Sequence, residues 1–381
     1  MSQRIISGNG CIKELNSILR SIKSEKFMLV CDSSFPFLSI KNQICELDIP
    51  FVSFSEFTPN PIYEDVVKGV DLFQKANCDV IMAVGGGSTI DVAKCIKLYS
   101  KMDSSKNYLE QEYNDSGIPL IAIPTTAGTG SESTRYAVVY FKEQKQSITH
   151  ESIIPNYVLL EPSVLKTLPV YQKKCTMLDA LCQGIESWWS INSNDESKAY
   201  SKIAVESIIK YMDSYIYDND ELAAEKIMLA ANYSGRAINI TQTTAAHAMS
   251  YKLTSIYNLP HGHAVSICLP YIWRFMSDNT NLCVEPRGEK YLQNIFSDIS
   301  RALCSNNPTE AIDNFTTMLK RMQIIAPNEV SKDDLHNLIK SVNPTRLKNN
   351  PVELNASAIT LLYKKILSYG SDEERNKNDL A

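Results

Sequence analysis

The stretch DVIMAVGGGSTIDVAKCIKLYS, residues 79–100, decides the fold. It opens with a short apolar run of the length and composition of a buried strand. Three glycines and a serine follow at 85–88, and the segment 89–100 then has the composition of a helix. We therefore predict a strand, a glycine turn and a helix in succession. This is the unit from which parallel sheets covered by helices on both faces are built.

The segments around this stretch repeat the same alternation. Residues 26–32 (KFMLVCD) form a short apolar run that ends in an acid, residues 66–76 have helical spacing, and residues 118–126 form a third apolar run. Strands that alternate with helices indicate a mainly parallel sheet. We predict that residues 1–162 form an α/β domain of this kind.

The pattern changes after residue 162. Apolar residues now recur every three or four positions, which is typical of amphipathic helices. The segments with this spacing are 174–190, 197–216, 221–241, 290–303 and 311–324. We predict that residues 163–381 form a second domain that is all α.

Length and composition agree with this plan and exclude several functions. A chain of 381 residues is longer than one hydrophobic core usually spans, so two domains are expected. The net charge is −5 and no basic stripe occurs, so we expect no nucleic acid partner. We find neither a run of about 18 apolar residues nor a signal-peptide pattern, so we expect no membrane span and a cytoplasmic chain. The ten cysteines form no CxxC pair, and we expect reduced, mostly buried thiols.

Two turns of small residues are candidates for a nucleotide site. Gly86, Gly87 and Ser88 leave backbone N–H groups open to a ligand, and the positive end of the following helix favours an anion such as a diphosphate. The pattern differs from G-x-G-x-x-G, and glycine turns often only make a tight bend. The second turn, 124–134, is otherwise an ordinary polar loop, and it supplies Thr125, Thr126, Thr129 and Ser131. Because each turn follows an apolar run, we expect one shared crevice at the strand ends.

Three of the five histidines, His247, His261 and His263, lie within residues 243–265. Asp179 and Gln183 are four residues apart in a predicted helix and so share one face of it. One Asp and two His are a ligand set for a divalent transition metal, to which a glutamine adds a weaker amide oxygen. An isolated histidine is more often a core or surface residue, so spacing alone leaves a metal site open.

Four motifs carry a family resemblance: GGGSTIDVAK (85–94), PTTAGTGSE (124–132), LDALCQGIES (178–187) and LPHGHAV (259–265). Together they resemble the iron-containing, or group III, alcohol dehydrogenases over nearly the whole chain. The resemblance implies a dehydroquinate synthase-like architecture. In it, a Rossmann-like dinucleotide-binding domain precedes a helical domain, with a metal in the cleft between them.

The same resemblance implies roles for single residues. The family's metal ligands, one Asp and three His, fall on Asp179, His247, His261 and, as a departure, Gln183. A further family histidine beside the nicotinamide falls on Tyr251, a second departure. The resemblance implies an Fe²⁺ or Zn²⁺ site, and we expect Tyr251 or His263 to relay a proton.

The resemblance also assigns the nucleotide. An acid at the position of Asp32 favours NAD(H), with NADP(H) as the alternative, because a carboxylate binds ribose hydroxyls and repels a 2′-phosphate. Lys145 matches a family lysine near the cofactor, and Asp91 lies within the first motif. We expect both residues to belong to the nucleotide site.

Segments 179–190, 234–255 and 260–265 resemble one branch of the family, the phosphonoacetaldehyde reductases. These enzymes reduce phosphonoacetaldehyde to 2-hydroxyethylphosphonate in phosphonate biosynthesis. A dianionic substrate needs a cation and hydroxyl groups, for which the candidates are Arg236, Thr243 and Thr244. Two alternatives remain: an alcohol dehydrogenase for a small uncharged substrate, and a non-redox or non-catalytic relative of the same fold. We expect a homodimer or higher homo-oligomer.

Overall fold

The computed structural model describes residues 3–342 and 347–369. By its internal packing the chain divides into two compact units. The first comprises Met1–Lys173 and Tyr211–Asn239, and the second comprises Lys174–Lys210 and Ile240–Ala381. The domain boundary near residue 162 rests on the sequence pattern alone and stays a prediction.

A six-stranded sheet forms the centre of the first unit, with the order β1-β8-β5-β4-β2-β3. All its neighbouring strands run parallel, which confirms the predicted parallel sheet. Its strands are β1 (Arg4–Ser7), β2 (Phe27–Cys31), β3 (Phe51–Phe54), β4 (Val80–Gly85), β5 (Leu120–Pro124) and β8 (Tyr157–Leu160). The central strands β2, β4 and β5 are wholly buried, as expected for strands covered on both faces.

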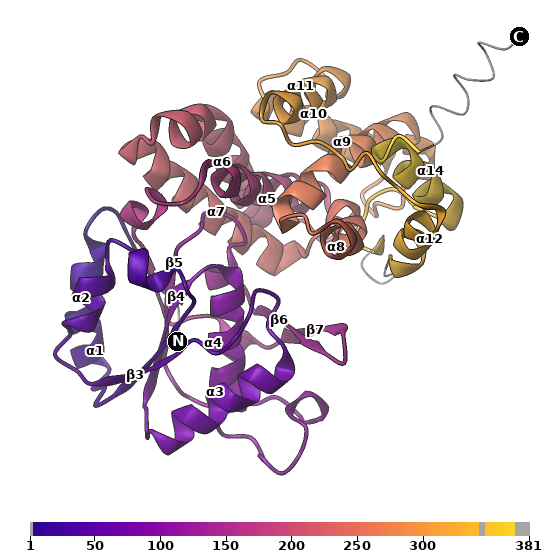
Figure 1. The fold of residues 1–381 in the computed structure, drawn as a ribbon. Coiled ribbons are helices and arrows are strands. Elements are labelled where there is room, and N and C mark those ends of the chain that lie inside the picture. The colour runs from indigo at the N-terminus through magenta and orange to yellow at the C-terminus, as the bar shows by residue number, and fades with distance from the viewer. Residues whose placement is uncertain (1–2, 343–346, 370–381) are drawn as a thin grey trace, which may run out of the picture. The chain divides into compact units, whose positions relative to one another are not determined.

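Helices cover both faces of this sheet. The helices of the first unit are α1 (Leu15–Ser21), α2 (Lys41–Cys45), α3 (Tyr63–Lys75), α4 (Gly87–Tyr99) and most of α7 (Glu221–Thr241). Figure 1 shows α1 and α2 on one face and α3 and α4 on the other. Val66, Val70 and Phe73 form the buried stripe of α3 that the helical spacing predicted. An antiparallel hairpin, β6 (Tyr136–Phe141) and β7 (Gln144–Thr149), completes the unit.

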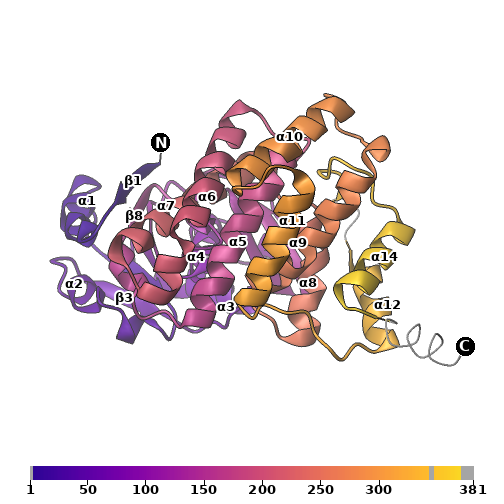
Figure 2. The same ribbon diagram turned by 90° about the horizontal axis from the view of Figure 1, so that it is seen from above.

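The second unit is helical, as predicted. It contains most of α5 (Val170–Trp189) and α6 (Asp195–Asp213), together with α8 (Ala245–Tyr257), α9 (His261–Asp278), α10 (Glu289–Ala302), α11 (Pro308–Arg321), α12 (Lys332–Ser341) and α14 (Ala356–Ile366). Figure 2 shows α8 beside α9, with α11 and α14 on opposite sides of α9. Fully buried Trp273 packs edge-on against Trp189, 5.7 Å between ring centroids, and joins α9 to α5.

Every one of the ten cysteines is a free thiol and most are buried, as expected. Across residues 3–342 and 347–369, none of the helices combines the length and the apolar character that a membrane crossing requires.

Candidate active site

The glycine turn after β4 is shorter than the sequence predicted. Gly85 is the last residue of β4, Gly86 caps α4, and α4 begins at Gly87 rather than at residue 89. Glycine is required at these positions because a side chain would not fit there, and not because the backbone has a positive φ. A Cβ on Gly85 would lie 2.3 Å from Thr89 Oγ1, and one on Gly87 would lie 2.9 Å from the Thr129 side chain. The first N–H groups of α4 have no partners within the helix, so this turn can receive an anion.

Asp32 follows β2, the strand next to β4. The chain leaves β2 toward β3 on one side and returns through β4 toward β5 on the other, so the strand order reverses between β2 and β4. Nucleotides bind at such a switch point, at the carboxyl ends of the strands. Thr89 Oγ1 donates to Asp32 Oδ2 at 3.1 Å, and the Ser34 N–H donates to Oδ1 at 2.8 Å. The Asp32 carboxylate is thereby fixed beside the start of α4.

The second turn lies against the first. The Thr125 N–H donates to the Gly85 carbonyl at 3.0 Å. A Cβ on Gly86 would lie 3.5 Å from the Thr126 side chain. Thr129 Oγ1 accepts from the Ser131 N–H at 3.2 Å and so tightens the turn. The two turns therefore form one polar surface at the end of β4 and β5.

A buried lysine that we did not predict holds this second turn. Lys94 Nζ donates to Ser131 Oγ at 3.1 Å, to the Thr134 carbonyl at 2.8 Å and to the Tyr136 carbonyl at 2.7 Å. Ser131 Oγ in turn donates to Asp91 Oδ1 at 2.6 Å, and the backbone N–H of Val138 donates to Asp91 Oδ2 at 3.0 Å. Both oxygens of Asp91 therefore have partners inside the first unit.

Burial shifts the ionisation of this buried-lysine cluster. It lowers the pKa of Lys94 to about 8, although the charge of Asp91 partly opposes the shift. It also raises the pKa of Asp91, against the charge of Lys94. Lys145 lies on β7, and its charge, like that of Lys94, partly opposes the rise in the pKa of Asp91. Glu132, at the end of the second turn, accepts from Asn232 Nδ2 at 3.0 Å. Direct contact of Asp91 and Lys145 with the cofactor stays a prediction.

The second unit brings the predicted metal ligands together. Asp179 and Gln183 lie one turn apart on α5, His247 lies on α8, and His261 is the first residue of α9. His247 Nε2 lies 3.3 Å from Asp179 Oδ1, and His261 Nε2 lies 3.9 Å from the same oxygen. Of the described residues, the only group of three or more His, Cys, Asp or Glu with ligand spacing is Asp179, His247 and His261, whose ligand atoms all lie within 4.8 Å of one another.

The glycine of the PHGH motif makes this approach possible. A Cβ on Gly262 would lie 1.9 Å from the carbonyl oxygen of Cys175 and 2.9 Å from the Cβ of Asp179. Only glycine lets the first turn of α9 pack this closely on α5. The sequence placed a proline-led loop before His261 and did not predict that α9 begins at this residue.

Three buried atoms at this centre have no hydrogen-bond partner among the described residues. They are Asp179 Oδ1, Gln183 Oε1 and His247 Nε2. Buried polar atoms are almost always paired, because an unpaired one costs about 1–3 kcal/mol. All three are metal-ligand atoms, so a divalent cation fits the site. Gln183, the departure from the family pattern, contributes an amide oxygen where the family has an imidazole.

Neighbouring charges set the ionisation of the ligands. Burial by itself would raise the pKa of Asp179, but the contact with His247 and the charge of His261 lower it below its ordinary value. Burial would likewise lower the pKa of His247, yet the carboxylates of Glu186 and Asp179 raise it to about 9. Metal-free His247 is therefore an imidazolium at neutral pH, and cation binding must release its proton.

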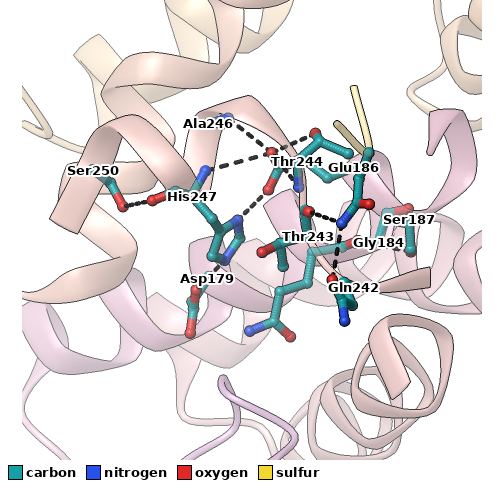
Figure 3. A network of polar contacts seen from close by, with 12 residues as sticks. Asp179, Gly184, Glu186, Ser187, Gln242, Thr243, Thr244, Ala246, His247 and Ser250 are labelled. Carbon is teal, nitrogen blue, oxygen red and sulfur yellow. Dashed lines mark hydrogen bonds and ion pairs between the residues drawn. The ribbon is translucent and has the colours of Figure 1, made fainter. Parts of the chain in front are cut away.

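Glu186 is the residue of this site that our sequence analysis missed. It is fully buried on α5, and its carboxylate pairs with His247 Nδ1 (Figure 3). Asp179, Gln183 and Glu186 follow one another at intervals of four and three residues, so they lie on one face of the helix. Three polar residues on the buried face of an apolar helix are the signal that could have identified Glu186.

The two candidate proton donors lie in different surroundings. The Tyr251 ring stacks on the His261 ring, with 5.6 Å between centroids and 4° between planes. His263 is 5% exposed, and its Nε2 pairs with the Ile325 carbonyl at 2.8 Å. Burial lowers the pKa of His263. Tyr251 thus contacts a predicted ligand directly.

The three candidate substrate residues lie in both units. Arg236 lies on α7 in the first unit, with its guanidinium 5.5 Å from the Tyr233 ring centroid. Thr243 and Thr244 precede α8 in the second unit. Thr244 is fully buried, and its hydroxyl accepts from Trp189 Nε1 at 2.9 Å. Contact of these three residues with substrate stays a prediction.

Comparisons with known proteins agree with the geometry. Residues 2–162 match the family "Iron-containing alcohol dehydrogenase", and residues 174–367 match "Fe-containing alcohol dehydrogenase family, C-terminal". A phosphonoacetaldehyde reductase from Streptomyces viridochromogenes is 29% identical over 74% of this chain and 74% of its own length. An NAD-dependent methanol dehydrogenase from Bacillus methanolicus is 28% identical over 71% of this chain and 73% of its own.

A solved structure shares the fold. Sulfoacetaldehyde reductase from Bifidobacterium kashiwanohense, in complex with NAD⁺, superposes with a TM-score of 0.86 at 24% identity, over 96% of this chain and 97% of that one. The matches confirm the dehydroquinate synthase-like fold class, an oxidoreductase of alcohols or aldehydes, and NAD(H) with a divalent metal as the cofactors. The chain belongs to the iron-containing alcohol dehydrogenase family.

Proposed function

We propose that this chain uses NADH to reduce a small aldehyde with an anionic head group, phosphonoacetaldehyde, to 2-hydroxyethylphosphonate. The observation that carries the proposal is the set of three buried, unpaired ligand atoms on Asp179, Gln183 and His247. When bound there, a divalent cation supplies Lewis-acid polarisation of a carbonyl oxygen, while NADH supplies the hydride equivalent. The residues that would hold the cation are these three and His261.

The four ligand side chains surround the proposed cation position and leave it open to solvent only on the side of His261. Side chains of Asp179 and His247 are 4% exposed, whereas that of His261 is 36% exposed. Substrate therefore approaches from the side of His261. Because the other ligands are enclosed, they also exclude water from the position that the aldehyde oxygen occupies, which strengthens electrostatic interactions there.

Tyr251 Oη is the group that we assign to proton transfer. The alcohol product gains one proton on oxygen, and a phenol is a competent donor. The Tyr251 ring lies flat on His261, on the more exposed side of the ligand set. His263 is a weaker candidate because its Nε2 is engaged with the Ile325 carbonyl.

A similar protein of known substrate and the guanidinium of Arg236 support an anionic head group on the substrate. The Streptomyces viridochromogenes relative is a phosphonoacetaldehyde reductase. Arg236 can donate two parallel hydrogen bonds to a phosphonate, which a lysine cannot do. Thr243 is half-buried and adds a hydroxyl, whereas the Thr244 hydroxyl is enclosed by Glu186 and Trp189.

Support for NADH over NADPH comes from Asp32. Its carboxylate lies at the end of β2, at the switch point of the sheet. There it can accept hydrogen bonds from the two ribose hydroxyls of NADH, and it repels the 2′-phosphate of NADPH. We expect kcat/KM to be higher with NADH. A higher value with NADPH would refute this part of the proposal.

Steady-state oxidation of NADH tests the substrate assignment. We expect kcat/KM for phosphonoacetaldehyde to exceed that for butanal and glycolaldehyde at least tenfold, and a chelator to abolish turnover. Arg236→Met should lower kcat/KM for phosphonoacetaldehyde and leave that for butanal unchanged. A preference for butanal would instead identify an alcohol dehydrogenase for uncharged substrates. NADH binding without turnover of any aldehyde would indicate a non-catalytic relative.

A further inference from the structure

Glu186 joins α5 to the beginning of α8. Its Oε1 accepts from Thr244 Oγ1 at 2.7 Å, from the Thr244 N–H at 3.2 Å and from the Ala246 N–H at 2.8 Å. Each of these groups is a donor directed at one oxygen. The carboxylate is fully buried, and so are Thr244 and Ala246. Oε1 is therefore fixed by the start of α8, and the orientation of the whole carboxylate is fixed with it.

The other oxygen of Glu186 determines which nitrogen of His247 carries hydrogen. Oε2 pairs with His247 Nδ1 (Figure 3). An ionised carboxylate only accepts hydrogen bonds, so Nδ1 must carry the hydrogen. The lone pair of the neutral imidazole is then on Nε2. This nitrogen is buried, lies 3.3 Å from Asp179 Oδ1 and has no hydrogen-bond partner among the described residues.

We infer that Glu186 is a positioning residue of the metal centre: it holds the His247 ring with hydrogen on Nδ1, so that Nε2 presents its lone pair to the cation. The inference rests on the metal site of the proposed function. It assigns a role to a residue outside the ligand set, which reaches the cation only through His247. Carboxylate partners of this kind orient metal-bound histidines and make them more basic in other metalloproteins.

An isosteric change separates this role from simple space filling. Glu186→Gln keeps the size and shape of the side chain, and its single oxygen is required by the four donors at the start of α8, the Thr244 hydroxyl and the N–H groups of Thr244, Ala246 and His247. Its NH₂ group then faces His247 Nδ1. Two donors cannot pair, so His247 must move its hydrogen to Nε2 or turn away. Either response withdraws the lone pair from the cation.

Two control variants test the competing explanation of a structural role. Thr244→Val removes a donor to the same carboxylate and leaves the contact between Glu186 and His247 in place. Glu161→Gln changes an equally buried carboxylate in the first unit, where it accepts from Gly10 N–H at 2.7 Å and Ser163 N–H at 3.3 Å. Each variant perturbs a buried hydrogen-bond network without changing the His247 tautomer.

The experiment measures Zn²⁺ affinity by chelator competition and records the visible spectrum of the Co²⁺ form. We expect Glu186→Gln to bind Zn²⁺ about 10- to 100-fold more weakly and to show an altered Co²⁺ spectrum, with unchanged far-UV circular dichroism. Glu161→Gln should remain within about threefold of wild type, and Thr244→Val, which removes one of several donors to Oε1, should lose clearly less affinity than Glu186→Gln. Wild-type affinity in Glu186→Gln, or an equal loss in Thr244→Val, would overturn the inference. A wild-type chain that binds no Zn²⁺ or Co²⁺ would overturn the proposed metal centre itself.

A second measurement needs no variant and so does not depend on the folding of Glu186→Gln. The Zn²⁺-loaded wild-type chain, labelled with ¹⁵N histidine, should show the ring hydrogen of His247 on Nδ1 and the metal-shifted resonance on Nε2. Hydrogen on Nε2 would overturn the inference even if the site binds zinc tightly. His247→Gln assigns the resonances, because it removes one of only five histidines.

Discussion

The Lys94 cluster of the first unit and the metal-ligand set of the second are both largely buried, and they differ in how completely the chain pairs their polar atoms. In the first unit, Lys94 Nζ has oxygen partners on Ser131, Thr134 and Tyr136. In the second, Asp179 Oδ1 and His247 Nε2 lie 3.3 Å apart as an ion pair, and neither atom has a hydrogen-bond partner among the described residues. Both clusters are buried, so exposure does not explain the difference.

The difference separates a structural cluster from a binding site. A buried polar network is stable when each member is paired, and the Lys94 cluster fixes the turn of residues 124–134 in that way. A set of unpaired ligand atoms is destabilising until something binds to it. Unpaired atoms of metal-ligand type that lie within a few ångströms of one another therefore identify the metal centre more clearly than the number of charges does.

Asp179→Asn should have the largest effect on metal binding and catalysis. The change keeps the size of the side chain and removes the one carboxylate in the ligand set. We expect loss of bound metal and at least about a thousandfold loss of kcat/KM, on the order of 4 kcal/mol of transition-state stabilisation. Metal analysis and steady-state kinetics measure the two effects. Wild-type metal content in this variant would show that the unpaired atoms are not the binding site.

Lys94→Met tests the other cluster. It removes the charge that partners Asp91 and leaves several oxygens unpaired, so the free energy of unfolding should fall by about 3–5 kcal/mol. Zn²⁺ affinity of the folded chain should not change. Urea unfolding and chelator competition provide the two readings. If the variant loses zinc but keeps its stability, the roles of the two clusters have been assigned in reverse.

Among the strands, the sequence predicted the three that are wholly buried and missed the others. β2, β4 and β5 are wholly buried, so each reads as an uninterrupted apolar run. β1 and β3 are four residues long and partly exposed at the edges of the sheet, and the hairpin strand β7 is mostly polar. Such short, mixed segments carry no periodicity that distinguishes them from loops.

At the metal centre, the ligands could be predicted from the sequence and the residues that support them could not. Asp179, His247 and His261 were identified from chemistry, spacing and the family motifs, and the structure brings them together. Glu186 and Lys94 were not identified, because a Glu or Lys in a helix is usually a solvated surface residue. Only the packing of α5 on α8, and of α4 on β6, shows that these charges are buried and paired.

The two clusters should change the free energy of unfolding with pH in opposite directions. The folded-state pKa of His247 is raised from 6.5 to about 9. Its stabilising contribution is therefore complete below pH 6.5 and is lost as pH rises toward 9. The pKa of Lys94 is depressed from 10.5 to about 8, so its unfavourable contribution is relieved only above pH 8.

Between pH 6.5 and 8, His247 should therefore dominate the difference between the metal-free wild-type chain and His247→Gln. We expect the stability of wild type relative to this variant to fall with pH, by at most about 1.4 kcal/mol per unit. Added Zn²⁺ should flatten the slope, because metal-bound His247 has released its proton and the unfolded histidine is also largely neutral above pH 6.5. Urea unfolding at several pH values, with and without Zn²⁺, measures both. Parallel curves for wild type and variant would contradict the assigned pKa shift.

Gln183→His should have the smallest effect, and it tests the departure from the family pattern directly. An imidazole nitrogen is a stronger ligand for Zn²⁺ than an amide oxygen. The Oε1 atom of Gln183 is buried and unpaired, so the site has a position for a better donor. We expect Zn²⁺ affinity to rise about tenfold, near 1.4 kcal/mol, with a smaller gain for Mg²⁺ or Mn²⁺ because these cations prefer oxygen. Gln183→Leu should lower the affinity for all of these metals. If Gln183→Leu binds Zn²⁺ as tightly as wild type, the amide oxygen is not a ligand, and the centre consists of Asp179 and two histidines alone.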